Sequence, residues 1–174
     1  MHVLVATDGE IKASTAAEFA SRLAGDDGRV TVLTVVEVPR TFLNDIRDHW
    51  GPGEGASVVA DYTFVETPVA RQDGPTGWPG DAAMIDRYLR DKLRRNTGPL
   101  VDALAQRGID VEARVIESEN VTSAIMKEIV ELDADVVVIG SHGEGLFQGL
   151  LGSTGTKIVR RSPRPVLLIR SATT

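Results

Sequence analysis

The chain of 174 residues contains no cysteine and only 3 histidines. The absence of cysteine excludes disulfides, cysteine–zinc sites and thiol catalysis. The histidines stand far apart, at positions 2, 49 and 142, so they do not favour a dedicated metal site. No apolar run approaches the ~18 residues of a membrane span, and the N-terminal Met-His-Val-Leu-Val-Ala lacks the basic leader of a signal peptide. We therefore expect a cytoplasmic protein with no membrane partner.

Acidic residues are missing from the last part of the chain, where none follows Glu144. The net charge of the whole chain is −6, which argues against nucleic acid as a partner. The last 30 residues nevertheless carry only positive charge, from Lys157, Arg160, Arg161, Arg164 and Arg170. A basic segment in an acidic protein indicates an anionic ligand.

Hydrophobic residues make up 42% of the chain and charged residues 25%, which is typical of a globular protein. Short apolar runs alternate with helical patterns. Strands are expected at 3–6, 30–36, 111–116, 136–139 and 166–169. Helices are expected at 14–24, 82–106, 121–132 and 153–161, with Ser14 and Asn120 as N-caps and Gly25 as a stop. The alternation predicts an α/β fold with a doubly wound, five-stranded parallel sheet covered by helices on both faces.

The expected helix at 82–106 contains a proline. Its apolar positions form one stripe of residues, namely Ile85, Leu89, Leu93, Leu100 and Leu104. Pro99 interrupts this stripe, and an interior proline removes a backbone hydrogen bond and clashes one turn back. The sequence therefore predicts a kink or a break at Pro99.

Residues 39–80 interrupt the alternation with five of the 8 prolines and both tryptophans. A loop of this length is uncommon in a compact domain. We predict one domain over 1–174 with an inserted loop or arm at about 39–80. Residues 58–59 and 62–65 could form a small hairpin in this arm; a structureless surface insertion is the alternative.

Two expected strand ends carry residues suited to a ligand. The first is Ala6-Thr7-Asp8-Gly9, and the second is the glycine-rich stretch from Gly140 to Gly155. Ligands of open parallel sheets bind beyond the carboxyl ends of the strands, and glycines let backbone amides approach a phosphate. Because Gly152-Ser153-Thr154 opens a helix, the pattern predicts phosphate binding there; turn glycines in a plain connection are the alternative.

Asp8 has two interpretations that the sequence leaves open. It can hold a turn through its own carboxylate, or it can accept hydrogen bonds from ribose hydroxyls at the switch point of the sheet. The glycine spacing fits neither the phosphate loop of NTPases nor the dinucleotide fingerprint. Ser141 and His142 are adjacent in sequence, which does not make a catalytic triad.

The chain resembles the universal stress protein family in several segments outside 39–80. These segments are Val-Ala-Thr-Asp-Gly at 5–9, Leu-Thr-Val-Val-Glu at 33–37, Asp-Ala-Asp-Val-Val-Val-Ile-Gly-Ser-His-Gly at 133–143, Leu-Leu-Gly-Ser-Thr at 150–154 and Arg-Pro-Val-Leu-Leu-Ile-Arg at 164–170. The resemblance implies the strand order 3-2-1-4-5, a dimer and, in one subclass, an ATP site with Mg²⁺ as a possible companion of the nucleotide.

The resemblance also implies a set of binding residues. Ala6, Thr7 and Asp8 would meet adenine and ribose, Val35 would line the adenine pocket, and Ile139 and Gly140 would flank base and ribose. Gly143, Gly152, Ser153 and Thr154 would hold phosphates. Eight residues separate Gly143 from Gly152, one fewer than in the ATP-binding pattern of the family.

Three functions follow as hypotheses. The first is an ATP-binding stress-response or regulatory protein that acts as a homodimer through its last strand, 166–169, without fast turnover. The second is a protein-interaction module of the same fold that binds no nucleotide and uses the 39–80 insertion. The third is a slow ATPase or self-phosphorylating protein that uses Ser141, Ser153 or Thr154.

Overall fold

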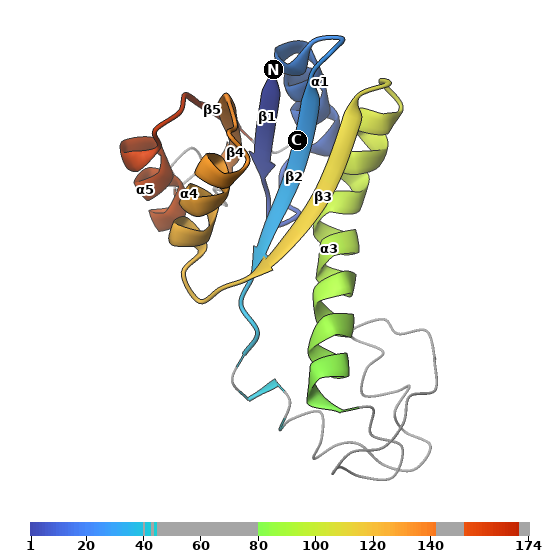
Figure 1. The fold of residues 1–174 in the computed structure, drawn as a ribbon, viewed down its shortest axis with the longest axis vertical. Helices are drawn as coiled ribbons and strands as arrows, with labels where there is room; N and C mark the ends of the chain where they lie inside the picture. Colours follow the sequence, from blue (N-terminus) through green and yellow to red (C-terminus); the bar gives the residue numbers. More distant parts are fainter. Residues whose placement is uncertain (40, 43, 45–79, 142–151, 171–174) are drawn as a thin grey trace.

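The structure is a computed structural model that describes residues 1–39, 41–42, 44, 80–141 and 152–170. Strands and helices alternate along these residues (Figure 1). The strands are β1 (His2–Ala6), β2 (Arg29–Val36), β3 (Asp110–Glu117), β4 (Val136–Ser141) and β5 (Val166–Arg170). The helices are α1 (Ala13–Ala24), α3 (Asp81–Ala105), α4 (Val121–Glu131) and α5 (Ser153–Arg161).

The five strands form one parallel sheet in the order β3-β2-β1-β4-β5. β1 lies in the centre, where Val3 pairs with Val30 of β2 on one side and with Val136 of β4 on the other. All residues of β1 are buried. The fold class and the strand order expected from the sequence are confirmed.

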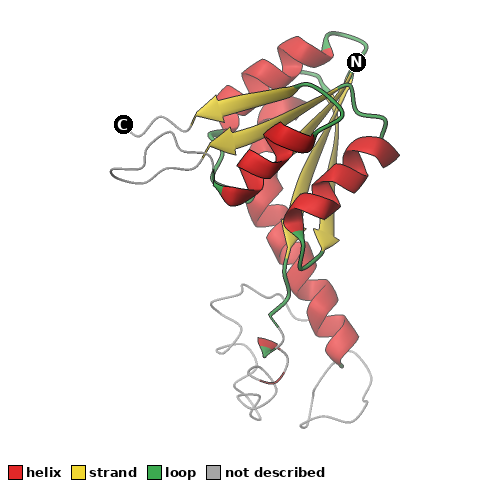
Figure 2. Ribbon diagram, turned by 90° about the vertical axis from the view of Figure 1, so that its left-hand side faces the viewer, coloured by secondary structure: helices red, strands yellow, loops and turns green. Residues whose placement is uncertain are grey.

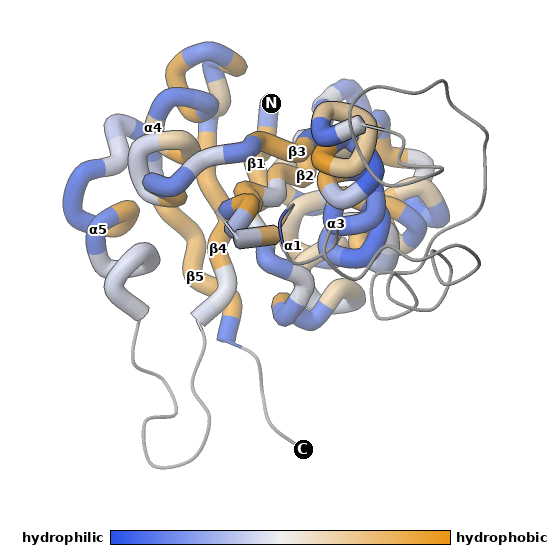
Figure 3. The backbone as a smooth tube through the Cα atoms, turned by 90° about the horizontal axis from the view of Figure 1, so that it is seen from below, coloured by the Kyte–Doolittle hydropathy of each residue, from blue (hydrophilic) through white to orange (hydrophobic). Residues whose placement is uncertain are grey.

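Helices cover both faces of the sheet (Figure 2). Alternate strand residues point to opposite faces, so Val3 and Val5 pack against α1 and α3, whereas Leu4 and Ala6 pack against α4 and α5. Figure 3 shows the same arrangement by hydropathy: the strands in the middle are mainly apolar, and the helices around them contain many polar residues. Two cores on one sheet explain why the inner strands β1 and β4 are apolar on both faces.

The helix ends agree with the sequence in two of three cases. Asn120 caps α4, because its side chain accepts a hydrogen bond of 3.0 Å from the amide of Ser123. Gly25 ends α1 with φ of 72°, a conformation that glycine adopts without strain. The expected cap at Ser14 is wrong: α1 begins at Ala13, Lys12 occupies the N-cap position, and no side chain caps it within the described chain.

α3 continues through Pro99, so the break that the sequence offered as one of two outcomes does not occur. Leu100 and Leu104 are fully buried against the sheet and α1, and their burial outweighs the one hydrogen bond that proline removes. Near the proline, the hydroxyl of Thr97 donates to the carbonyl of Leu93 at 2.6 Å. Packing therefore decides the course of this helix.

The expected single stripe along α3 is wrong in its first half. The buried residues there are Met84, Tyr88 and Asp91, whereas Leu89 is only partly buried. At about 100° per residue, Tyr88 lies about 160° around the helix from Leu104. The first half of α3 extends beyond the strands (Figure 1), so it buries a different face from the half that packs on the sheet.

A small apolar cluster stabilises this extension of α3. Val36, Phe42, Met84 and Tyr88 are its buried members, and the rings of Phe42 and Tyr88 lie 4.5 Å apart between centroids. Most of the expected insertion, including the proposed hairpin at 58–59 and 62–65, lies outside the described residues. Among the helices that the structure describes, none combines the length and apolar character needed to cross a bilayer.

His2 joins three parts of the fold at the amino end of the sheet. Its Nδ1 donates to the carbonyl of Leu132 at 2.9 Å, and its Nε2 lies 2.8 Å from the hydroxyl of Thr31. Because a carbonyl only accepts, Nδ1 carries the proton, and in the neutral ring Nε2 accepts from Thr31. Burial lowers the pKa of His2 below its ordinary value, since the buried site disfavours the charged ring.

We predict that acidification destabilises the fold through His2. The folded-state pKa of His2 lies below the unfolded value of about 6.5, so the folded protein binds fewer protons than the unfolded chain. The free energy of unfolding therefore falls as the pH drops through and below the unfolded pKa. Urea unfolding at pH 7.5 and pH 5.5 should show a loss of stability at the lower pH. The variant His2→Gln, which cannot titrate, should lose less between the same two pH values. An equal loss in both proteins would contradict the assignment.

Candidate functional site

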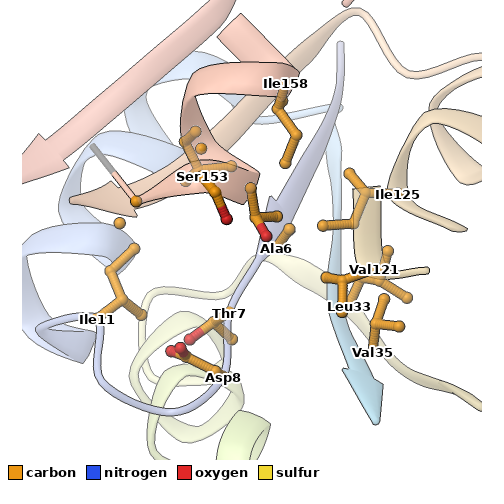
Figure 4. Close-up of a pocket in the computed structure, with 15 residues that line it drawn as sticks. Ala6, Thr7, Asp8, Ile11, Leu33, Val35, Val121, Ile125, Ser153 and Ile158 are labelled. Carbon is orange, nitrogen blue, oxygen red and sulfur yellow. The ribbon is translucent and has the colours of Figure 1, made fainter. Parts of the chain in front are cut away.

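A cavity of about 360 Å³ opens beyond the carboxyl ends of β1 and β4. Its lining comes from the loop after β1, from β2 and β4, and from α4 and α5 (Figure 4). Here the connections leave on opposite sides, because β1 leads to α1 on one face and α5 follows β4 on the other. The volume falls in the range of small-molecule sites.

The loop after β1 forms one side of the cavity. The amide of Thr7 donates to the carbonyl of Leu33 at 2.9 Å, so the loop starts as an extension of the sheet. The hydroxyl of Thr7 then accepts from the amide of Gly9 at 2.9 Å, and Asp8 Oδ1 accepts from the amide of Glu10 at 3.2 Å. These side-chain bonds hold a tight turn with Thr7 and Asp8 at the cavity.

Apolar side chains form the opposite side of the cavity. Figure 4 shows Leu33 and Val35 of β2 beside Val121 and Ile125 of α4. Leu33 and Val35 point to the same face because they are two residues apart on a strand, and Val121 and Ile125 are one turn apart on a helix. Such a wall suits a flat apolar group such as a heterocyclic base.

The start of α5 contributes backbone amides. The first bond within the helix runs from the amide of Thr156 to the carbonyl of Gly152 at 2.9 Å, so the amides of Ser153, Thr154 and Gly155 precede it. Within the described chain no side chain caps this end, and its first turn carries no acidic residue. Free amides and the helix dipole together favour an anion at this point.

The basic residues of the C-terminal segment contribute less than the sequence suggested. Arg160 and Arg161 lie in the last turn of α5, at the far end from the cavity. Arg164 pairs with Asp133 at 2.5 Å. None of the five basic residues of this segment is among the described lining residues, so the groups available to an anion there include the backbone amides at the start of α5 and no cluster of cations.

Nine of the ten residues expected at the binding site line this single cavity. They are Ala6, Thr7, Asp8, Val35, Ile139, Gly140, Gly152, Ser153 and Thr154. Gly143 lies outside the described residues, as do the rest of the shortened loop and His142. The structure brings the expected residues together; their part in nucleotide binding stays a prediction.

Five further lining residues were missed on the sequence: Ile11, Leu33, Val121, Ile125 and Ile158. Gly155, the last residue of the expected glycine-rich stretch, lines the cavity too. Strand alternation would have added Leu33 from Val35, and helical spacing would have joined Val121 with Ile125. Helical spacing would also have added Ile158, which follows Thr154 by one turn of α5. Ile11 carried no such signal, because it lies in the loop between β1 and α1. The missed residues make the cavity more apolar than the expected set.

Both interpretations of Asp8 have structural support. One carboxylate oxygen holds the turn through the amide of Glu10, and the residue also lines the cavity. Asp8 is the only acidic residue among the described lining residues. It can therefore shape the loop and face a ligand at the same time.

Comparison with known proteins gives the family of the chain. The model of the universal stress protein family matches residues 1–170. The chain belongs to the universal stress protein family. A universal stress protein of Thermus aquaticus is 32% identical over 87 residues, which is 49% of this chain and 64% of that protein. The chain spans less than two thirds of the length of the curated relatives that it matches.

Solved structures share the fold of this universal stress protein. A family member from Arabidopsis thaliana with AMP bound has a TM-score of 0.57 at 15% identity, with coverage of 99% of this chain and 92% of that chain. A universal stress protein in complex with cAMP has a TM-score of 0.51 at 21% identity, with coverage of 98% and 96%. Adenine nucleotides therefore bind to proteins of this fold.

Proposed function

We propose that this universal stress protein binds an adenine nucleotide, with ATP as the expected ligand, and acts in a stress response without fast turnover. The observation that carries the proposal is the cavity itself, which joins an apolar wall, a carboxylate and an uncapped helix start. The base would pack on Leu33 and Val35, Asp8 would accept from the ribose, and the amides of α5 would meet phosphates. The AMP and cAMP complexes of the two solved structures support an adenine nucleotide as the class of ligand.

Mg²⁺ would come to the site with the nucleotide. Among the described residues, no group of three or more histidines and carboxylates is placed to hold a metal. Phosphate oxygens, which are hard ligands, would therefore supply most of the coordination. The direct test of the proposal is a calorimetric titration with ATP, in the presence and absence of Mg²⁺. Absence of binding in both titrations would favour the alternative, a protein-interaction module that binds no nucleotide.

Slow hydrolysis or self-phosphorylation is the less favoured alternative. Ser141 is buried, with 4% of its surface exposed, whereas Ser153 is exposed at the start of α5. Phosphate release measured over hours, together with the intact mass of the protein after incubation with ATP, separates these activities from simple binding.

We predict that Gly152→Val weakens ATP binding by about 1–3 kcal/mol, the scale of one lost hydrogen bond to a charged group. Gly152 has φ of −57° and ψ of 169°, which any residue can adopt, and among the described residues a β-carbon there meets no atom within 4 Å. The variant should therefore fold, while its methyl groups occupy space in the cavity. Calorimetry should show a smaller loss for Gly152→Ala. Unchanged affinity in a folded Gly152→Val protein would exclude phosphates from this position.

We predict that Asp8→Ala lowers the affinity for ATP more than the affinity for inorganic triphosphate, because only ATP carries a ribose. Asp8→Asn is the matched control, since its amide oxygen can still accept from Glu10 and hold the turn. Binding of both ligands to the three proteins is measured by calorimetry. Equal losses for the two ligands would show that Asp8 acts on the loop alone.

We also propose that the protein forms a homodimer through β5. β5 pairs with β4 on one side and ends the sheet on the other. Val166, Leu167 and Leu168 are only partly buried in the single chain, so an apolar strand lies at the sheet edge. Such an edge favours association with a second strand, and a two-fold pair closes it.

We predict that Leu168→Lys shifts the protein from a dimer towards the mass of one 18.7 kDa chain in sedimentation at micromolar concentration. The substitution places a positive charge on β5, at the sheet edge where the two chains are proposed to pair. Val130→Lys is the control, because Val130 lies on α4 with 67% of its surface exposed. Circular dichroism checks that both variants fold. If the unmodified protein already sediments as a monomer, the dimer proposal is wrong.

A further inference from the structure

Asn96 lies in α3, across the sheet from the apolar wall of the cavity. Its side-chain amide donates to the hydroxyl of Thr34 at 2.9 Å. Thr34 is fully buried, and its neighbours on β2, Leu33 and Val35, point to the opposite face and line the cavity. The hydrogen bond therefore fixes the side chain of Asn96 against β2, on the face of the sheet opposite to the apolar wall.

The loop after β1 rests directly on Asn96. A β-carbon built on Gly9 would lie 3.2 Å from Cα and 3.3 Å from Oδ1 of Asn96. Gly9 has φ of 101°, a conformation in which residues with a side chain are strained. The backbone conformation favours glycine, and the close approach leaves little room for a side chain at this position.

Asp8 is thereby held from two sides. On one side, the amide of Thr7 is bonded to the carbonyl of Leu33 on β2. On the other, Gly9 is bonded to the hydroxyl of Thr7 and packs against Asn96. Neither Asn96 nor Thr34 lines the cavity, yet together they support the residue next to the only described carboxylate in its lining.

We propose that Asn96, held by Thr34, is a positioning residue of the nucleotide site that orients Asp8 towards the ribose hydroxyls. The inference rests on the proposed nucleotide function. Loss of the Asn96 side chain removes Oδ1 and Cγ from the contact with Gly9, although Cα stays, and it removes the bond that fixes α3 to β2 at this point. Asp8 then keeps its charge but loses its fixed orientation, so recognition of the hydroxyls suffers more than binding of base and phosphates.

The test compares ATP with its 2′,3′-dideoxy analogue, which lacks both ribose hydroxyls. Their dissociation constants are measured by calorimetry for the unmodified protein and for Asp8→Ala, Asn96→Ala and Thr34→Val. The unmodified protein should prefer ATP, and Asp8→Ala should abolish the preference. Asn96→Ala should reduce it by about fivefold, the scale of one hydrogen bond, and Thr34→Val should act in the same direction. Thr34→Val keeps the shape of the side chain, so it serves if Asn96→Ala does not fold.

Thr97→Val is the matched control on the same helix. It removes the buried bond from the Thr97 hydroxyl to the carbonyl of Leu93 and should lower the melting temperature without changing the preference for ATP. A reduced preference in this control as well would show a general effect of helix stability and overturn the positioning role. A full preference for ATP in folded Asn96→Ala would overturn it too.

Hydrogen exchange of the ligand-free protein separates this inference from the proposed function. Asn96→Ala should speed exchange of the Gly9 amide, whether or not a nucleotide binds. Faster exchange together with ATP binding and reduced ribose preference supports the inference. If the unmodified protein binds neither nucleotide, the proposed function is wrong, and so is the role of Asn96 in ribose recognition. If the protein binds ATP with ribose preference and Asn96→Ala changes neither exchange nor preference, the positioning role alone is wrong.

Discussion

The position of β1 between β2 and β4 is the constraint on which the rest of the site depends. Every residue of β1 is buried, and the strand pairs on both sides. After β1 the chain continues into α1 on one face of the sheet, and after β4 the next described helix is α5 on the other face. Two connections that diverge leave a space at the carboxyl ends of the strands. The position of the cavity is therefore a consequence of the strand order. The residues that line it decide which ligand it can bind.

The chemistry divides between side chains and backbone. In the proposed binding mode, apolar side chains on β2 and α4 provide a wall for a base, whereas the amides that open α5 bind the phosphates. Each hydrogen bond from an amide to a charged phosphate contributes about 1.5–3 kcal/mol. Most arginines of the last 30 residues lie elsewhere, as the Arg164–Asp133 pair and the last turn of α5 show. The glycines of this segment are thus a better indication of a phosphate site than its positive charge.

The sequence was sufficient for the sheet and for most of the site, but insufficient for α3. The strands were predictable because a central parallel strand such as β1 must be apolar on both faces. The residues at the ends of β1 and β4 were predictable because strand ends meet at one edge, whereas Val35 and Ile139 were expected only from the resemblance to the family. The burial of Tyr88 and Asp91 was not predictable, because it depends on how far α3 extends beyond the sheet. Periodicity gives a face only when one surface covers the whole helix. Likewise, no local pattern connects Asn96 with Gly9, which are 87 positions apart.

In the proposed positioning role, the Asn96 contact matters more for a ligand than for the fold. The bond from Asn96 to Thr34 contributes about 1 kcal/mol to stability, against a total of about 5–15 kcal/mol for a typical domain. The two packed faces of the sheet do not depend on it. The turn at Asp8, however, is held by short side-chain bonds and one close approach, 3.2 Å from Asn96 Cα to the place of a β-carbon on Gly9. Hydrogen bonds weaken steeply as their geometry departs from linear, so a small displacement of this loop would cost ribose recognition while leaving the sheet intact.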